Sequence, residues 1–174
     1  MKKALIVYHS RSGHTRRVAQ ALAKRLHADL DEIRIVQPMP GWLGYLMCAI
    51  ESLAALAPAL RPGRHRPSDY GLVLIGTPVW FWNVSSPVRS WLQAHALKHR
   101  VAFFCTMGGS GSARAFATMA ALAGKEPVAT LALTEDEVDR GAFEAKLDAF
   151  VQQLAAGAPR PRHVSARHGL PAAA

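Results

Sequence analysis

The sequence predicts an α/β fold in which one parallel sheet of five strands carries helices on both faces. Strand-like apolar runs alternate with helix-like segments five times along the chain, and this alternation is typical of an open parallel sheet. The strongest run, GLVLIGT at 71–77, is continuously apolar, as expected of a strand that is buried on both faces. The 174 residues, half of them apolar, are enough for one compact domain with a sizeable core.

The first half of the chain contains two predicted strands with a helix between them. The run KALIVYH at 3–9 is the first strand, and the shorter, alternating DEIRIVQ at 31–37 is the second. Residues 15–27 form an amphipathic helix in this interpretation, because apolar side chains recur four positions apart at Val18, Leu22 and Leu26. These elements give the first strand, helix and strand of the alternation.

The second half supplies the remaining strands. GLVLIGT at 71–77 is the third, RVAFFCT at 100–106 the fourth and EPVATLAL at 126–133 the fifth. A helix is predicted at 87–97, where Pro87 suits the first turn. A second helix of small residues follows the fourth strand and ends near 122.

The last helix is marked by a capping box. Thr134 is the expected N-cap, and Glu137 stands three residues later in an acidic first turn. A single apolar face then continues to the end of the helix through Phe143, Leu147, Phe150, Val151 and Leu154.

Two segments do not follow the alternation. The nearly apolar segment 41–56 is a core helix, a substrate lid or a subunit contact. As a subunit contact it would form a homo-oligomer. Residues 157–174 form a basic Pro/Ala-rich tail without periodicity, which we expect to be disordered. The expected domain therefore covers residues 1–156.

The net charge of +9 raises the question of nucleic acid, a membrane surface or an acidic partner. The basic residues are dispersed and no nucleic-acid-binding signature accompanies them, so we expect a solvated basic surface and no nucleic acid. Cys48 and Cys105 are far apart and lack histidines at ligand spacing, so we expect small apolar side chains, with no disulfide and no metal site.

The sequence also predicts a protein of the cytoplasm. No apolar run approaches the ~20 residues that a membrane span needs. The apolar stretch that follows the two N-terminal lysines is shorter than the ~7–15 residues of a signal-peptide core.

In open parallel sheets, ligands bind outside the carboxyl ends of the strands, and three turns at that edge are rich in polar residues, glycine or aromatics. SRSGHT at 10–15 offers hydroxyls and the start of a helix, whose free amides suit a phosphate. It lacks the residues of a Walker motif and the spacing of a dinucleotide fingerprint. An ordinary capped turn is the alternative.

The other two turns are TPVWFWN at 77–83 and TMGGSGS at 106–112. Three successive large aromatics cannot all be buried on one face, so stacking on a flat ligand would account for at least one of them. An anchoring cluster or a protein interface is the alternative. The glycines of the third turn allow close backbone approach to a ligand, or form a flexible linker.

Together and in this order, the three segments resemble those of the flavodoxin-like flavoproteins, over roughly residues 3–155. The resemblance implies a three-layer sandwich with strand order 2-1-3-4-5 and bound FMN. It assigns the FMN phosphate to Ser10, Arg11, Ser12, Gly13, His14 and Thr15, with His14 adding positive charge if protonated. The isoalloxazine would lie along Pro78, Val79, Trp80, Phe81, Trp82 and Asn83, and its pyrimidine end would approach Thr106, Met107, Gly108 and Gly109.

The family contains both reductases and electron carriers. The carriers are typically acidic and stack a third-loop tyrosine on the flavin, whereas this chain is basic and TMGGSG holds no aromatic. The expected function is therefore an FMN-dependent oxidoreductase that moves electrons from NAD(P)H to a quinone-like or other small-molecule acceptor. The alternatives are a flavodoxin-type carrier between protein partners and a flavin-free domain that binds through its basic surface. No residue stands out as a general acid or base, and flavin chemistry does not require one.

Overall fold

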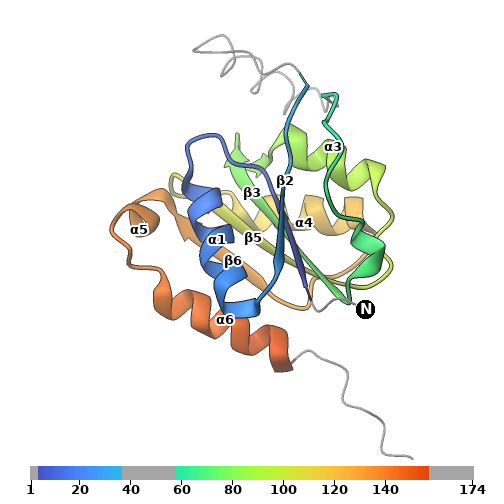
Figure 1. Cartoon of the computed structure of the whole chain (residues 1–174). Coiled ribbons are helices and arrows are strands. Elements are labelled where there is room, and N and C mark those ends of the chain that lie inside the picture. The colour runs from blue at the N-terminus through green and yellow to red at the C-terminus, as the bar shows by residue number, and fades with distance from the viewer. Residues whose placement is uncertain (1–3, 37–57, 157–174) are drawn as a thin grey trace, which may run out of the picture.

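The computed structural model describes residues 4–36 and 58–156, in which strands and helices alternate (Figure 1). In chain order the elements are β1 (Leu5–Tyr8), α1 (His14–Leu26), β2 (Asp29–Glu32), the 3-10 helix η1 (Pro67–Asp69), β3 (Leu72–Trp80), β4 (Asn83–Val84), α3 (Ser86–Ala94), β5 (Arg100–Met107), α4 (Ser112–Ala123), β6 (Thr130–Thr134), α5 (Glu135–Asp139) and α6 (Glu144–Ala156).

The sheet confirms the predicted fold class and strand order. Its main path runs β2-β1-β3-β5-β6, and every pair along this path is parallel. Counted without the short β4, this is the order 2-1-3-4-5. The sequence did not predict β4, which pairs antiparallel with the end of β3 and makes the sheet six-stranded.

Helices cover both faces of the sheet, so that the core has two halves. Alternate residues of β1 face opposite sides: Ile6 belongs to the cluster that includes α1 and α6, and Leu5 to the cluster that includes α3. Both side chains are fully buried. This burial explains why the strands appear in the sequence as continuous apolar runs.

The strand β3 is longer than predicted. The sequence places a turn at 77–83, but Pro78, Val79 and Trp80 continue the strand. Pro78 pairs with β5, while Val79 and Trp80 pair with β4. Pairing with β4 extends β3 beyond its apolar run. Nothing in the two residues of β4 indicated a strand.

Two other strands are displaced from their predicted positions. The second covers 29–32 rather than 31–37, because β1 offers only four residues for pairing. Beyond it, Ile35 makes only an isolated antiparallel bridge to Leu60. The last strand covers 130–134 rather than 126–133, where it pairs with the second half of β5.

The capping box is confirmed, but the final helix is divided. The Glu137 amide donates to Thr134 Oγ1 at 3.2 Å, and the Thr134 amide donates to Glu137 Oε2 at 2.8 Å. The short helix α5 then ends, and Gly141 adopts a left-handed φ of 70° before α6 begins. Glycine tolerates this conformation, which a continuous helix cannot contain.

Some predictions fall outside the described residues, namely those for segment 41–56, Cys48 and the tail 157–174. Cys105 is fully buried in β5, as predicted for a small apolar residue. Its burial raises the pKa of the thiol to about 12. Within residues 4–36 and 58–156, no helix has the length and apolar character of a membrane span, and no cluster of potential metal ligands is found.

Candidate functional site

A pocket of about 310 Å³ opens at the carboxyl edge of the sheet, beyond the ends of β3 and β5. We call it the aromatic pocket, and it receives residues from all three predicted turns. The residues that line it are Arg11, Val79, Trp80, Phe81, Trp82, Gly108, Gly109 and Ser110. Seven of these eight are among the sixteen predicted site residues, and Ser110 was missed. The structure therefore brings together segments that lie far apart in the sequence.

The second turn holds two aromatic residues in an unfavourable backbone conformation. Phe81 and Trp82 connect the paired residues Trp80 and Asn83, and their φ angles are 47° and 57°. Two left-handed residues between paired strands form the type of hairpin turn that usually contains Asn-Gly. Bulky side chains are rare at such φ values, and this strain is typical of functional sites. The turn keeps both side chains partly in solvent, with Phe81 40% and Trp82 62% exposed.

The third turn packs closely against the second. Trp82 Nε1 donates to Ser110 Oγ at 3.1 Å. Gly111 has a φ of 105°, and a Cβ placed on it would lie 2.7 Å from Trp82 Cα and 2.9 Å from a methyl group of Val79. Only glycine fits this position. Gly111 was not among the predicted site residues, although the run GGSG was a signal for it.

In the first turn, the Ser10 side chain organises the start of α1. Its Oγ accepts hydrogen bonds from the amides of Gly13 and Arg16, both at 3.2 Å. Gly13 itself, at a φ of 99°, is the N-cap residue of the helix. The Gly13 amide therefore donates within the turn, whereas the Ser10 hydroxyl proton remains available to an acceptor outside it. The helix start also leaves amides without a carbonyl partner inside the helix.

His14 connects the first turn to α5. Its Nδ1 lies 2.7 Å from Ser12 Oγ, and its Nε2 lies 3.1 Å from Asp139 Oδ1. Glu135 is also near, at 3.6 Å from Nδ1. Sequence reasoning missed both carboxylates, which come from a helix about 120 residues away in the chain. They would offset any positive charge that His14 carries, so its expected contribution to a phosphate site is smaller than the sequence indicated.

Thr15 and Thr106 join the first turn to the end of β5. Their hydroxyl oxygens are 2.8 Å apart, and each residue is only 1% exposed. One hydroxyl donates to the other, so a single proton of the pair remains for another acceptor. Thr15 was predicted to hold the FMN phosphate and Thr106 to approach the pyrimidine end of the isoalloxazine. The structure places their side chains in direct contact.

His9 is a further residue that was not predicted. Its Nδ1–H donates to the Ile33 carbonyl at 3.0 Å, and its ring meets the Trp80 ring edge to face at a centroid distance of 5.6 Å. Burial lowers the pKa of His9, which favours the neutral ring. His9, directly after β1, thereby supports one wall of the aromatic pocket.

Four of the residues predicted to contact the isoalloxazine do not line the aromatic pocket, namely Pro78, Asn83, Thr106 and Met107. The Pro78 carbonyl accepts from Thr77 Oγ1 at 2.8 Å, and Asn83 Oδ1 accepts from the Val84 amide at 2.8 Å. Both residues therefore shape the hairpin that carries the aromatics. Met107 is the last residue of β5, directly before the glycines of the pocket.

Comparisons with known proteins agree with this geometry. A family model described as flavodoxin matches residues 3–132. Among solved structures, a flavoprotein from Lactobacillus acidophilus in complex with FMN is 22% identical, with a TM-score of 0.65, covering 82% of this chain and 99% of its own. A protein from Bacteroides eggerthii described as a flavoprotein is 23% identical, with a TM-score of 0.69, covering 87% and 99%.

A WrbA-like flavodoxin from Agrobacterium tumefaciens has a TM-score of 0.50 and 16% identity, and the match covers 88% of this chain and 99% of that protein. At these identities the solved structures support the fold. The family model is the stronger finding, because it spans most of the chain and includes all three turns. The chain belongs to the flavodoxin family.

Proposed function

We propose that this protein binds FMN with the isoalloxazine in the aromatic pocket and the phosphate at the start of α1. The observation that carries the proposal is the convergence of Arg11, the hairpin 79–82 and the glycine turn 108–110 on one pocket. A flat aromatic ring system matches the exposed faces of Phe81 and Trp82. The Lactobacillus acidophilus neighbour was solved with FMN, which supports the same choice.

The phosphate would be held by the first turn. Ser10 offers its hydroxyl proton, and the helix start offers backbone amides and the positive end of its dipole. Arg11 lines the aromatic pocket from the same turn and adds a positive charge. The bound flavin would supply the redox chemistry, while the chain's own residues position it and set its electrostatic surroundings.

We assign the protein to the reductases, with NAD(P)H as the electron donor, a quinone-like or other small molecule as the acceptor and the cytoplasm as its location. Gly108 and Gly109 are exposed, and a Cβ on either would meet nothing within 4 Å. The third turn therefore leaves room beside the ring for a nicotinamide or a flat acceptor. The net charge of +9 also differs from that of the acidic carriers.

A second candidate is an electron carrier, and the exposed rim of the pocket favours it. Phe81 and Trp82 are two of the three large hydrophobic residues that are exposed in the described part of the chain. Exposed aromatics beside a redox centre would suit contact with a redox protein. They would contact that partner directly, whereas a reductase would use them to position small molecules.

An absorbance titration with FMN, followed by anaerobic addition of NADH and NADPH, tests these alternatives. A reductase gains flavin absorbance and is bleached by a nicotinamide within its turnover time. A carrier gains the absorbance, resists both nicotinamides and accumulates a long-lived neutral semiquinone. A protein that gains no flavin absorbance contradicts both candidates and leaves a flavin-free binding domain.

A further inference from the structure

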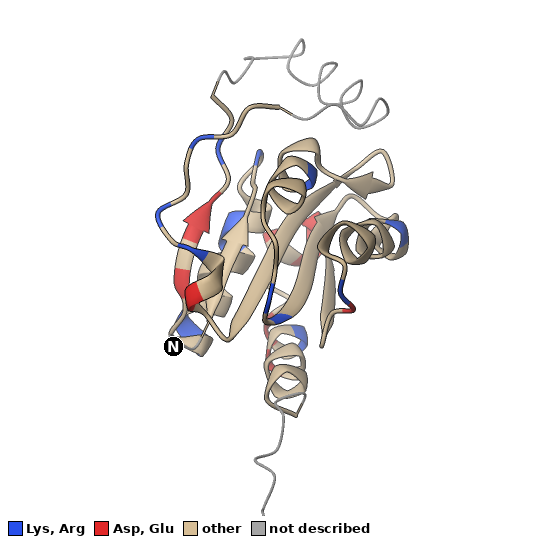
Figure 2. Ribbon diagram, turned by 90° about the vertical axis from the view of Figure 1, so that its right-hand side faces the viewer, with Lys and Arg blue, Asp and Glu red and all other residues tan. Residues whose placement is uncertain are grey.

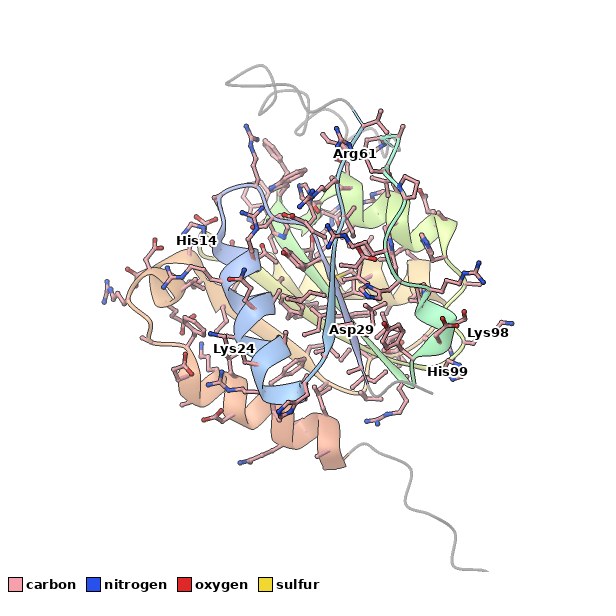
Figure 3. All side chains as sticks on the ribbon, in the orientation of Figure 1. His14, Lys24, Asp29, Arg61, Lys98 and His99 are labelled. Atoms are coloured by element: carbon pink, nitrogen blue, oxygen red, sulfur yellow. The ribbon has the colours of Figure 1, made fainter. Side chains whose placement is uncertain are left out.

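A second pocket, of about 250 Å³, lies at the carboxyl ends of β1 and β2. We call it the arginine pocket, because three of its residues are arginines. Figure 3 shows Arg61 at this end of the molecule, with Lys98 and His99 at the opposite end. The lining residues are Tyr8, Leu30, Asp31, Glu32, Arg34, Arg61, Pro62 and Arg64.

Asp31 fixes the wall of this pocket that contributes Arg61 and Arg64. The residue is only 9% exposed, and its Oδ2 accepts hydrogen bonds from the amides of Arg64 at 2.7 Å and His65 at 3.0 Å. The approach is so close that a Cβ on Gly63 would lie 2.7 Å from the same oxygen. The backbone of this segment is therefore anchored to β2.

A second set of bonds holds the same segment at its other end. The Arg61 amide donates to the Arg34 carbonyl at 2.8 Å, and the Val36 amide donates to the Ala59 carbonyl at 2.9 Å. The three arginines thus project from backbone that is bonded on both sides, as a preorganised binding site requires.

The carboxylates of the pocket are already engaged. Glu32 Oε1 accepts from Arg16 at 2.5 Å, and Glu32 Oε2 accepts from Arg34 at 2.9 Å. Burial opposes ionisation of Glu32, but these hydrogen bonds outweigh it and lower the pKa of the carboxyl. Figure 2 shows the acidic residues of β2 beside basic segments of the chain.

In contrast, the guanidinium groups of Arg61 and Arg64 have no hydrogen bond or ion pair with any part of the chain that the structure describes. The lining holds three arginines against two carboxylates, Asp31 and Glu32, so the pocket has an excess of positive charge. Tyr8 adds a hydroxyl, whose pKa is raised by burial and by the Glu32 charge, so it remains a donor.

We infer that the arginine pocket binds a phosphate monoester, and that in the proposed reductase this group is the 2′-phosphate of NADPH. Guanidinium groups match phosphate oxygens in paired, charge-assisted hydrogen bonds. The pocket adjoins the first turn, since Tyr8 is two residues before Ser10. The inference rests on the proposed function for the identity of the ligand, whereas the binding of a phosphate monoester does not depend on it.

Binding of nucleotide probes to the FMN-treated protein provides the first test. Calorimetry would compare 2′,5′-ADP with 5′-AMP, which differ only in the 2′-phosphate. We expect 2′,5′-ADP to bind more tightly, and the double variant R61Q/R64Q to lose at least about tenfold in affinity for it. Affinity for 5′-AMP should be unchanged. Because 5′-AMP is itself a phosphate monoester, equal binding of both probes, or a loss of 5′-AMP affinity in the variant, would overturn the assignment to the 2′-phosphate. Equal binding of 2′,5′-ADP by wild type and variant would overturn the inference as a whole.

A matched control removes the same charge elsewhere. Lys98 and Lys125 line a separate pocket at the opposite edge of the sheet. The variant K98Q/K125Q should bind 2′,5′-ADP like the wild type, and a comparable loss in this variant would show that net charge alone governs binding. Neither arginine side chain has a partner among the described residues, so R61Q/R64Q should keep the wild-type Tm.

Steady-state kinetics provide a second test that depends on the proposed function. In R61Q/R64Q the KM for NADPH should rise at least about tenfold, with the kcat and the KM for NADH unchanged. Equal changes for both nicotinamides would overturn the assignment to the 2′-phosphate. If neither nicotinamide reduces the wild-type protein, the proposed reductase fails, and the calorimetric result still decides whether the pocket binds a phosphate monoester.

Discussion

The two pockets at the carboxyl edge of the sheet are built in different ways. The aromatic pocket depends on backbone conformation: Phe81, Trp82 and Gly111 all have positive φ angles, and Arg11 is its one charged lining residue. The arginine pocket depends on side-chain charge, with three arginines, two carboxylates and a tyrosine. Ligand binding in the aromatic pocket should therefore respond mainly to changes in shape, and binding in the arginine pocket mainly to changes in charge and pH.

The difference follows from the strands that lie beneath each pocket. At the aromatic pocket, β3 and β5 are central strands whose turns must pack against each other, so the glycine turn meets the aromatic hairpin. At the arginine pocket, β2 is the edge strand of the main path, and its Asp31 binds the backbone of the arginine-rich segment 61–66. Charged residues are tolerated at such an edge. With the two proposed ligands, the sheet would hold an aromatic ring beside an anion.

The largest effect on stability is expected from Gly111→Ala, which changes the shape of the aromatic pocket. The new Cβ would clash with Trp82 and would hold a non-glycine residue at a φ of 105°. We expect a loss of at least about 2 kcal/mol in the free energy of unfolding, measured by urea denaturation. Gly109→Ala is the control, because its Cβ meets nothing within 4 Å. Equal stability of the two variants would contradict this account.

Thr106→Val should have the next largest effect, because it leaves the buried Thr15 hydroxyl without its partner. An unpaired buried hydroxyl costs about 1–3 kcal/mol. The double variant T15V/T106V should recover part of that loss, and a double-mutant cycle in urea would measure the coupling. Thr118→Val should change stability little, since its hydroxyl bonds to the Arg114 carbonyl at an exposed position. Additive effects of T15V and T106V would show that the two hydroxyls do not stabilise each other.

Trp82→Gly should separate stability from cofactor binding. Glycine relieves the left-handed strain at a φ of 57°, for an expected gain of about 1 kcal/mol in the free energy of unfolding. Loss of the stacking face should weaken FMN about tenfold, measured by fluorescence titration. Trp82→Ala is the control, because it removes the ring without relieving the strain. Unchanged FMN affinity in both variants would exclude Trp82 as a stacking residue.

Much of this edge could be predicted from the sequence, because the strands carry strong apolar signals and the three turns directly follow them. Seven of the residues lining the aromatic pocket were found in this way. The hairpin turn was missed, because Phe81-Trp82 has none of the Asn or Gly signals that normally mark a left-handed turn. Its conformation is imposed by the pairing of β3 with β4.

Long-range contacts account for the other omissions. Asp139 reaches His14 from a different layer of the fold, and no local pattern links the two residues. Asp31 was predicted within a strand, but its role as an anchor for the segment 61–65 depends on where that segment returns to the sheet. Local propensity predicts elements well, while contacts between distant segments depend on the complete topology.

The smallest expected effect, from Glu32→Gln, tests the charged side of the comparison. The pKa of Glu32 is below its ordinary value of 4.5, so its ionised form stabilises the protein above about pH 4.5 and this contribution is lost as pH falls through the lowered pKa. The variant should have a slightly lower Tm than the wild type at pH 7, and the difference should shrink toward pH 3. Glu126→Gln is the control, because this exposed residue makes no ion pair within the described chain.

Glu32→Gln should also affect ligand binding. It frees Arg16 and Arg34 from their ion pairs, so 2′,5′-ADP should bind more tightly while FMN affinity stays unchanged. Weaker binding of the probe would mean that Glu32 holds the arginines in position, and that the pocket depends on geometry after all.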